Sequence, residues 1–153
     1  MAAYSVKTGS VALTAATTKS LWLLNPVGDF FLIAQFGVSM DASAAAAGVG
    51  FELYRVTTIG SAAGTTYVPV KVNRQGDAAA AGSTAVAPVT TEPTAVEIIA
   101  EWFLQPFGGL FDIQYPLGRE PLGAAAGQRI GLRYTTPTGV SPNCRAYVFF
   151  DER

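Results

Sequence analysis

Short segments in which apolar and polar residues alternate, most of them closed by proline or glycine, recur along the 153 residues of this chain. The clearest is QRIGLRY at residues 128–134, which places Ile130, Leu132 and Tyr134 on one face and arginine or glycine on the other. A period of two is typical of a β-strand with one buried face, because successive side chains of a strand point to opposite sides. No segment combines helical periodicity with the length of a stable helix, so the pattern predicts an all-β protein.

The segment CRAYVFF at residues 144–150 has the same period. Alternate residues from Cys144 to Phe150 are predicted to face the core, and Tyr147 and Phe149 lie on the opposite face. Two aromatic side chains there predict that this face is covered as well. Cys144 is the only cysteine, so no disulfide can form within the chain, and its position predicts a small buried apolar residue.

Residues 51–88 are predicted to form a hairpin followed by a loop. Residues 51–58 and 66–73 are rich in β-branched and aromatic residues, and a Gly/Ser/Ala turn separates them. The second strand would place Val68, Val70 and Val72 on one half-buried face. Pro69 predicts a sheet edge, because proline has no N–H to donate to a neighbouring strand. The small, glycine-rich residues that follow predict a long surface loop.

Residues 21–40 are the most hydrophobic stretch, but Asn25, Pro26 and Asp29 interrupt it. A membrane span needs about 20 mostly apolar residues, so two strands joined by the turn NPVGD fit better. Residues 30–38 are apolar on both faces, which predicts a strand in the middle of a sandwich or at a subunit contact.

Residues 96–104, VEIIAEWFL, have features of both a helix and a strand. Nine residues between proline-bounded loops, rich in Val, Ile, Trp and Phe, favour the strand. That strand would carry Glu97 and Glu101 on one face, about 13 Å apart at ~3.3 Å per residue. Carboxylate pairs of glycosidases are separated by roughly 5 to 9.5 Å, so the two acids are predicted to be solvated surface residues.

Together these segments predict eight or nine short strands in one domain over residues 20–153, with residues 1–19 as an N-terminal arm or a first strand. The fold class that follows is an antiparallel β-sandwich, and the strand count suits an eight-stranded jelly roll. An immunoglobulin-like sandwich is the alternative, although its paired cysteines are absent.

Composition limits the chemistry open to this chain. It has no histidine and one cysteine, which removes Ser-His-Asp and Cys-His catalytic systems and the usual zinc sites. Its net charge of −1 gives no excess of positive charge to bind nucleic acid. Only 14% of the residues are charged, against the usual ~25%, which is typical of a chain that uses part of its surface for partners. We therefore expect no catalytic, cofactor or metal site, no enzymatic activity, and no nucleic-acid or membrane partner.

The order of features in FELYRVTTIGSAAGTTYVPVKVNRQGDAAAAGSTAVAP, residues 51–88, resembles small β-sandwich virion proteins of tailed bacteriophages. These features are an aromatic-rich strand, a Thr/Gly turn, a Thr-Tyr-Val-Pro-Val strand and an Asp-Ala-Ala loop that closes on Ala-Pro. The closing segment GQRIGLRYTTPTGVSPNCRAYVFFDER is similar to the last strands of the same proteins, and the resemblance covers residues 30–153. It implies a head decoration, or cement, protein that is made in the host cytoplasm. On the virion it would sit on the outer capsid as a homotrimer, bind the major capsid protein and reinforce the shell.

With that expectation, four residues are candidates for the subunit interface: Tyr147, Phe149, Phe31 and Ile33. A loop or the arm of residues 1–19 would grip the shell. The alternative function is a phage tail or fibre-tip adhesin that binds a host surface glycan. Its candidate contacts are Trp102 or Tyr115, on the condition that they are exposed.

Overall fold

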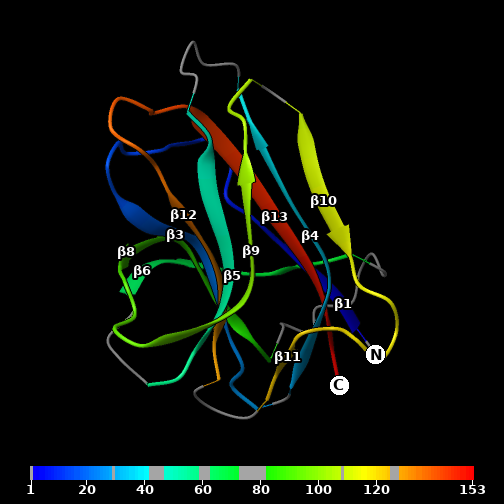
Figure 1. Ribbon diagram of the computed structural model, residues 1–153. Helices are drawn as coiled ribbons and strands as arrows, with labels where there is room; N and C mark the ends of the chain where they lie inside the picture. Colours follow the sequence, from blue (N-terminus) through cyan, green and yellow to red (C-terminus); the bar gives the residue numbers. More distant parts are fainter. Residues whose placement is uncertain are drawn as a thin grey trace.

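A computed structural model describes residues 2–28, 30–41, 47–58, 63–72, 82–107, 109–124 and 128–153. These residues form two antiparallel sheets that face each other, and there is no helix among them (Figure 1). The predicted all-β sandwich is therefore confirmed, whereas the eight-stranded jelly-roll topology stays a prediction. Over the same ranges, no helix has the length and apolar character needed to cross a membrane.

The first sheet, sheet A, has the last strand of the sequence at its centre. Its order is β10 (Leu110–Gln114), β4 (Phe31–Met40), β13 (Asn143–Glu152), β1 (Ala2–Lys7) and β7 (Val70–Lys71). Two short strands, β2 (Val11–Ala12) and β11 (Leu122–Gly123), pair with β13 and β4. Ala2 lies opposite Glu152 in the ladder between β1 and β13. Of the two expectations for residues 1–19, the structure contains the first strand, because residues 2–7 pair inside sheet A.

The second sheet, sheet B, has the order β6 (Ala63–Tyr67), β8 (Thr84–Thr91), β3 (Thr18–Asn25), β12 (Ile130–Thr135), β5 (Val49–Val56) and β9 (Val96–Leu104). The two strands predicted in residues 21–40 are thus present as β3 and β4, but they belong to different sheets. In Figure 1, β6 and β8 lie on the left, and β5 and β9 run down the front.

The hairpin predicted for residues 51–73 is wrong. β5 pairs with β12 and β9, whereas β6 pairs with β8 at the other edge of sheet B. The predicted second strand is divided at Pro69: β6 lies at an edge of sheet B and β7 at an edge of sheet A, as the proline indicated. Val68, Val70 and Val72 are exposed rather than half-buried. No strand within the described ranges covers them, because the chain crosses between the two sheets at this point.

The loop predicted after this segment is also wrong in its second half, where residues 84–91 form β8. Ala85 and Ala87 of β8 are buried in the core. Such small side chains give a weak apolar signal in the sequence, although they fit well where two layers approach each other. The first half of the predicted loop, residues 73–81, and the turn at residues 59–62 lie outside the described residues.

The core fills the space between the two sheets. Alternate side chains were predicted to face the core in residues 130–134, beginning with Ile130, and in residues 144–150, beginning with Cys144. Both predictions are confirmed, because these side chains are buried. A smaller cluster lies on the outer face of sheet B, where Leu23, Tyr54 and Val89 pack together. The Glu92 carboxylate accepts hydrogen bonds from the backbone N–H of Ser20 at 2.8 Å and from its hydroxyl at 2.5 Å. These bonds hold the end of β8 against β3.

Candidate functional site: two apolar edges of the sandwich

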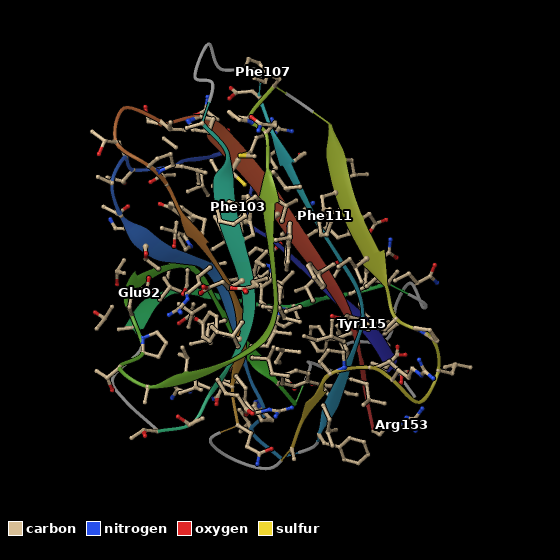
Figure 2. The ribbon with its side chains drawn as sticks, viewed as in Figure 1. Glu92, Phe103, Phe107, Phe111, Tyr115 and Arg153 are labelled. Carbon is tan, nitrogen blue, oxygen red and sulfur yellow. The ribbon has the colours of Figure 1, made fainter. Side chains whose placement is uncertain are left out.

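Large apolar side chains are exposed on and between two strands at one edge of the sandwich, β9 of sheet B and β10 of sheet A. Each of these strands ends its sheet, and they follow one another in the sequence. The exposed fractions are 82% for Phe103, 64% for Leu110 and 57% for Phe107, and Ile98 and Ile99 are also exposed. Figure 2 shows Phe103 on β9 and Phe107 beyond the end of that strand. We call these five residues the β9–β10 edge.

Stacked aromatic rings close the gap between β9 and β10 beneath this surface. Trp102 stacks on Phe111 of β10 with ring centroids 4.8 Å apart, and Phe36 and Phe51 lie 5.5 and 6.2 Å from Trp102. Tyr115 lies 6.2 Å from Phe36, and burial raises the pKa of its hydroxyl. Trp102 and Tyr115 are therefore half-buried parts of the core wall, and the exposure that a glycan platform requires is not met at either residue.

The opposite edge of the sandwich carries a second apolar surface. Residues 63–72 pass from β6 in sheet B to β7 in sheet A, and Val68, which is 73% exposed, Val70 and Val72 face solvent there. We call these three valines the β6–β7 edge. Single exposed apolar residues are ordinary on a protein surface, whereas several within one short segment mark a candidate site of contact.

The β9–β10 edge is also acidic. Glu101 lies directly opposite Glu52 across the ladder between β9 and β5. Arg133 donates to the Glu52 carboxylate at 2.5 Å, whereas Glu101 has no ion pair or hydrogen bond with any residue that the structure describes. Like charges directly opposite each other in a ladder destabilise it. Glu101 is thus an exposed carboxylate beside Phe103 that a cation from a partner would stabilise.

The prediction that Glu97 and Glu101 share one face is wrong. The register shifts within β9, so that Glu101 lies opposite Glu52 and Glu97 lies opposite Arg55. Residues 52 and 55 of one strand point to opposite faces, because their separation is odd. The shift is a β-bulge, which also leaves Ile98 on the surface although the strict alternation assigned it to the face of Trp102. The strand itself was predicted correctly.

Tyr147 and Phe149, two of the predicted interface residues, lie half-buried on the outer face of sheet A. Their rings meet edge to face with centroids 5.4 Å apart. The Tyr147 ring covers Gly37 of β4, where an added Cβ would come within 2.5 Å of the ring. Desolvation and a hydrogen bond to Asp112 raise the pKa of Tyr147. Both residues can still reach a partner, so their role as an interface stays a prediction.

The structure corrects the prediction that the other two residues, Phe31 and Ile33, lie at the subunit interface. Both are completely buried between the sheets, where Phe31 contacts the ring of Phe150. A side chain inside the core cannot contact a second subunit. The sequence of β4 is apolar on both faces, and the half-buried Leu32 and Ala34 occupy the outward one. The apolar pattern of residues 30–38 predicted a strand either in the interior of a sandwich or at a subunit contact. Phe31 and Ile33 belong to the interior.

A polar hollow of about 290 Å³ lies above sheet A and is lined by Ser10, Ser39, Met40, Asp41, Asn143 and Arg145. The Asp41 carboxylate accepts hydrogen bonds from the backbone N–H and the side-chain amide of Asn143 at 2.8 and 2.7 Å. These bonds lower the pKa of Asp41 and join the end of β4 to the start of β13. Within the described ranges, no three potential metal ligands come together.

Comparison with protein-family models finds no matching family, and a search of curated proteins finds no match to this chain. The alternation of residues along the chain gives no sign that Phe103, Phe107, Leu110 or Val68 would be exposed contact residues. Their hydrophobicity predicted burial, and the position of a strand at the edge of a sheet depends on pairing that is not local. The one available signal was Pro69, which correctly marked an edge.

Proposed function

We propose that this chain is a structural protein of a tailed-bacteriophage virion, which decorates the outer capsid and reinforces it as a trimer bound to the shell lattice. The virion assignment rests on the resemblance of residues 51–88 and 127–153 to head decoration proteins. The observation that carries the proposal is the β9–β10 edge, where Phe103, Phe107 and Leu110 face solvent. Covering one large apolar side chain contributes about 1.5–3 kcal/mol, so this surface favours a partner.

The proposed mechanism is the bridging of neighbouring capsomers. Each copy would contact other copies of itself and the major capsid protein, and the many weak contacts of a lattice add up through their effective concentration. Three surfaces are available for these contacts: the β9–β10 edge, the β6–β7 edge, and the outer face of sheet A at Tyr147 and Phe149. If Phe149→Arg leaves both the oligomer and its melting unchanged, the face of sheet A is not a subunit interface.

Quantitative mass spectrometry of purified virus particles tests this proposal. The number of copies of this chain is compared with that of the major shell subunit in the same particles. A number on the scale of the shell subunit is expected for a lattice decoration. Absence from the particles would overturn the virion assignment.

The alternative function, a tail or fibre-tip adhesin, has a different signature in the same experiment. It predicts a few copies per particle, together with binding of the isolated protein to host cells. Because Trp102 and Tyr115 are half-buried in the aromatic stack, the residues proposed for glycan contacts give this alternative no support.

A further inference from the structure

We infer that the outer face of sheet A binds an oligosaccharide that contains carboxylated sugar units, through the Arg145 guanidinium and the Tyr147 ring. The inference goes beyond the proposed function, because it assigns a ligand to the isolated chain and does not depend on a virion. Its argument comes from a hollow, an unpaired cation and an aromatic ring that are neighbours on this face.

The outer face of sheet A is charged around its two aromatic rings. Alternate residues of β13 from 143 to 149 point outward, because the residues between them are buried in the core. The charged residues around the hollow and the rings are Lys7, Asp41, Asp112 and Arg145. The centres of subunit interfaces are depleted of charge, so this face fits a polar ligand better than an apolar partner. The lattice contacts of the proposed function would then use the two apolar edges.

The polar hollow at the end of β4 supplies a cation for an acidic ligand. Its volume of about 290 Å³ is close to that of the smallest ligand pockets, about 300 Å³, so it has room for one sugar unit. Arg145 lines the hollow and has no ion pair or hydrogen bond with any residue that the structure describes. Ser39 lies directly opposite Arg145 in the ladder, and Ser10 adds a second hydroxyl group. A guanidinium in this position can bind a carboxylate through two parallel hydrogen bonds.

Asp41 requires that the same ligand also carry hydrogen-bond donors. Hydrogen bonds from Asn143 lower the pKa of Asp41 and fix the orientation of its carboxylate, which is therefore ionised at neutral pH. An ionised carboxylate accepts up to about four hydrogen bonds, and Asn143 supplies two of them. A ligand that satisfies both Arg145 and Asp41 must present an anion beside hydroxyl groups. A carboxylated sugar has this chemistry.

The Tyr147 ring lies along the sheet beside the hollow. Arg145 and Tyr147 are two residues apart on β13, about 7 Å at ~3.4 Å per residue. A Cβ built on Gly37 would lie 2.5 Å from Cε1 and Cζ of Tyr147, so the ring lies directly above β4. Its hydroxyl bonds to Asp112, which lies opposite Gly37 on β10. The ring is therefore held across three strands, and with Phe149 it offers an aromatic surface for the apolar C–H face of a sugar.

An acidic segment of a partner protein is the other ligand that the cations of this face could attract. Lys7 and Arg145 are matched by the carboxylates of Asp41 and Asp112, so a run of acidic residues would meet repulsion as well as attraction. Like charges brought together at a contact select against such a partner. The hydroxyl groups of a sugar can instead donate hydrogen bonds to the two carboxylates.

Nuclear magnetic resonance titration of the isotope-labelled full chain tests the site. The probes are trigalacturonate and sialyllactose, which carry carboxylates, and the methyl esters of both, in which the carboxylate is masked. Arg145→Gln removes the cation at an exposed position, and Tyr147→Leu removes the ring but still covers Gly37. Arg119→Gln is the matched control, because Arg119 is an exposed arginine between β10 and β11 and lies outside the hollow.

At least one carboxylated probe is expected to shift the amide signals of residues 39–41 and 143–147. Its methyl ester should bind at least about tenfold more weakly, and the acid should bind Arg145→Gln more weakly to the same extent, because each change removes the charge-assisted pair. In Arg145→Gln the acid and its ester should bind alike. Tyr147→Leu should weaken the binding of both forms, whereas Arg119→Gln should bind as the unsubstituted chain does.

Several outcomes would overturn the inference. The absence of shifts with both carboxylated probes at millimolar concentration would do so, as would equal binding of acid and ester to the unsubstituted chain. An equal loss of binding in Arg119→Gln and Arg145→Gln would indicate general attraction by positive charge. If hexaglutamate shifts the same signals at lower concentration than the sugars, the face binds an acidic protein segment instead.

The spectrum of each variant also reports whether it is folded, and Arg145→Gln alone decides the question if Tyr147→Leu unfolds. A chain that is abundant in particles but binds no probe overturns this inference alone. A chain that binds a carboxylated probe but is absent from particles overturns only the proposed function.

Discussion

Replacement of Gly131 by alanine is expected to lower the free energy of unfolding by about 2–4 kcal/mol, through crowding against Tyr54. An added Cβ on Gly131 would lie 2.5 Å from both Cζ and the hydroxyl oxygen of Tyr54. Tyr54 is completely buried, and its hydroxyl is 2.7 Å from the hydroxyl of Ser20. The Arg133 guanidinium lies 5.4 Å from the centre of its ring. The ring therefore cannot move aside without losing a hydrogen bond of about 1 kcal/mol and a cation–π contact of ~0.5–2 kcal/mol, in addition to the strain of overpacking.

Urea denaturation at a fixed protein concentration measures this loss. Gly28→Ala is the matched control, because no atom lies within 4 Å of its added Cβ, and its stability should be unchanged. Tyr54→Leu supplies the second background, since leucine lacks the Cζ and hydroxyl atoms that an alanine at residue 131 would meet. Gly131→Ala should cost much less in that background. An equal cost in both backgrounds, or a cost below about 0.5 kcal/mol in the unsubstituted chain, would refute the close-contact argument.

Three further predictions concern groups near the ends of the sheets. Glu152→Gln should lower the free energy of unfolding by about 2 kcal/mol, because the buried carboxylate accepts two backbone N–H groups and an amide nitrogen would face one of them; an unchanged urea midpoint would contradict this. The buried Cys144 thiol, with its pKa raised to about 12, should react with a thiol reagent only as the chain unfolds, so reaction at the rate of a free cysteine would disprove its burial. Hydrogen bonds from Asn143 lower the pKa of Asp41 from its usual value of 3.8 in the folded chain. The ionised Asp41 carboxylate therefore stabilises the fold above pH 3.8, and this stabilisation is lost as the pH falls below 3.8. The difference in stability between the unsubstituted chain and Asp41→Asn should therefore close on acidification, and a constant difference would refute this origin.

The faces of the most regular strands were predictable because they depend only on the alternation of side chains along one strand. Ile130 and Leu132 are buried and Tyr147 lies on the outer face, as their positions in the pattern required. The choice of neighbours was not predictable, since it depends on contacts between residues far apart in the chain. β5 pairs with β12, some 80 residues later, rather than with the next strand along. The hairpin expected at residues 51–73 failed for that reason.

The candidate interface could be predicted only in part. Phe31 and Ile33 stand in a strand that is apolar on both faces, and the pattern does not say which face meets the opposite sheet. The sequence also did not predict that Phe103 and Val68 are exposed. Their hydrophobicity indicates burial, whereas their exposure results from the positions of β9 and of the chain between β6 and β7 at the sheet edges.

The central place of β13 in sheet A affects how this chain is made. β13 lies between β4 and β1, and it follows every other strand in the sequence, so the ribosome delivers it last. Sheet B also waits for a late strand, because β12 lies between β3 and β5 and is made just before β13. During synthesis the growing chain therefore carries β1 and β4 without their shared neighbour, and a sheet B that is still divided in two. Their apolar inner side chains stay in water until residues 143–152 emerge, and a chaperone that shields them would improve the yield of folded protein.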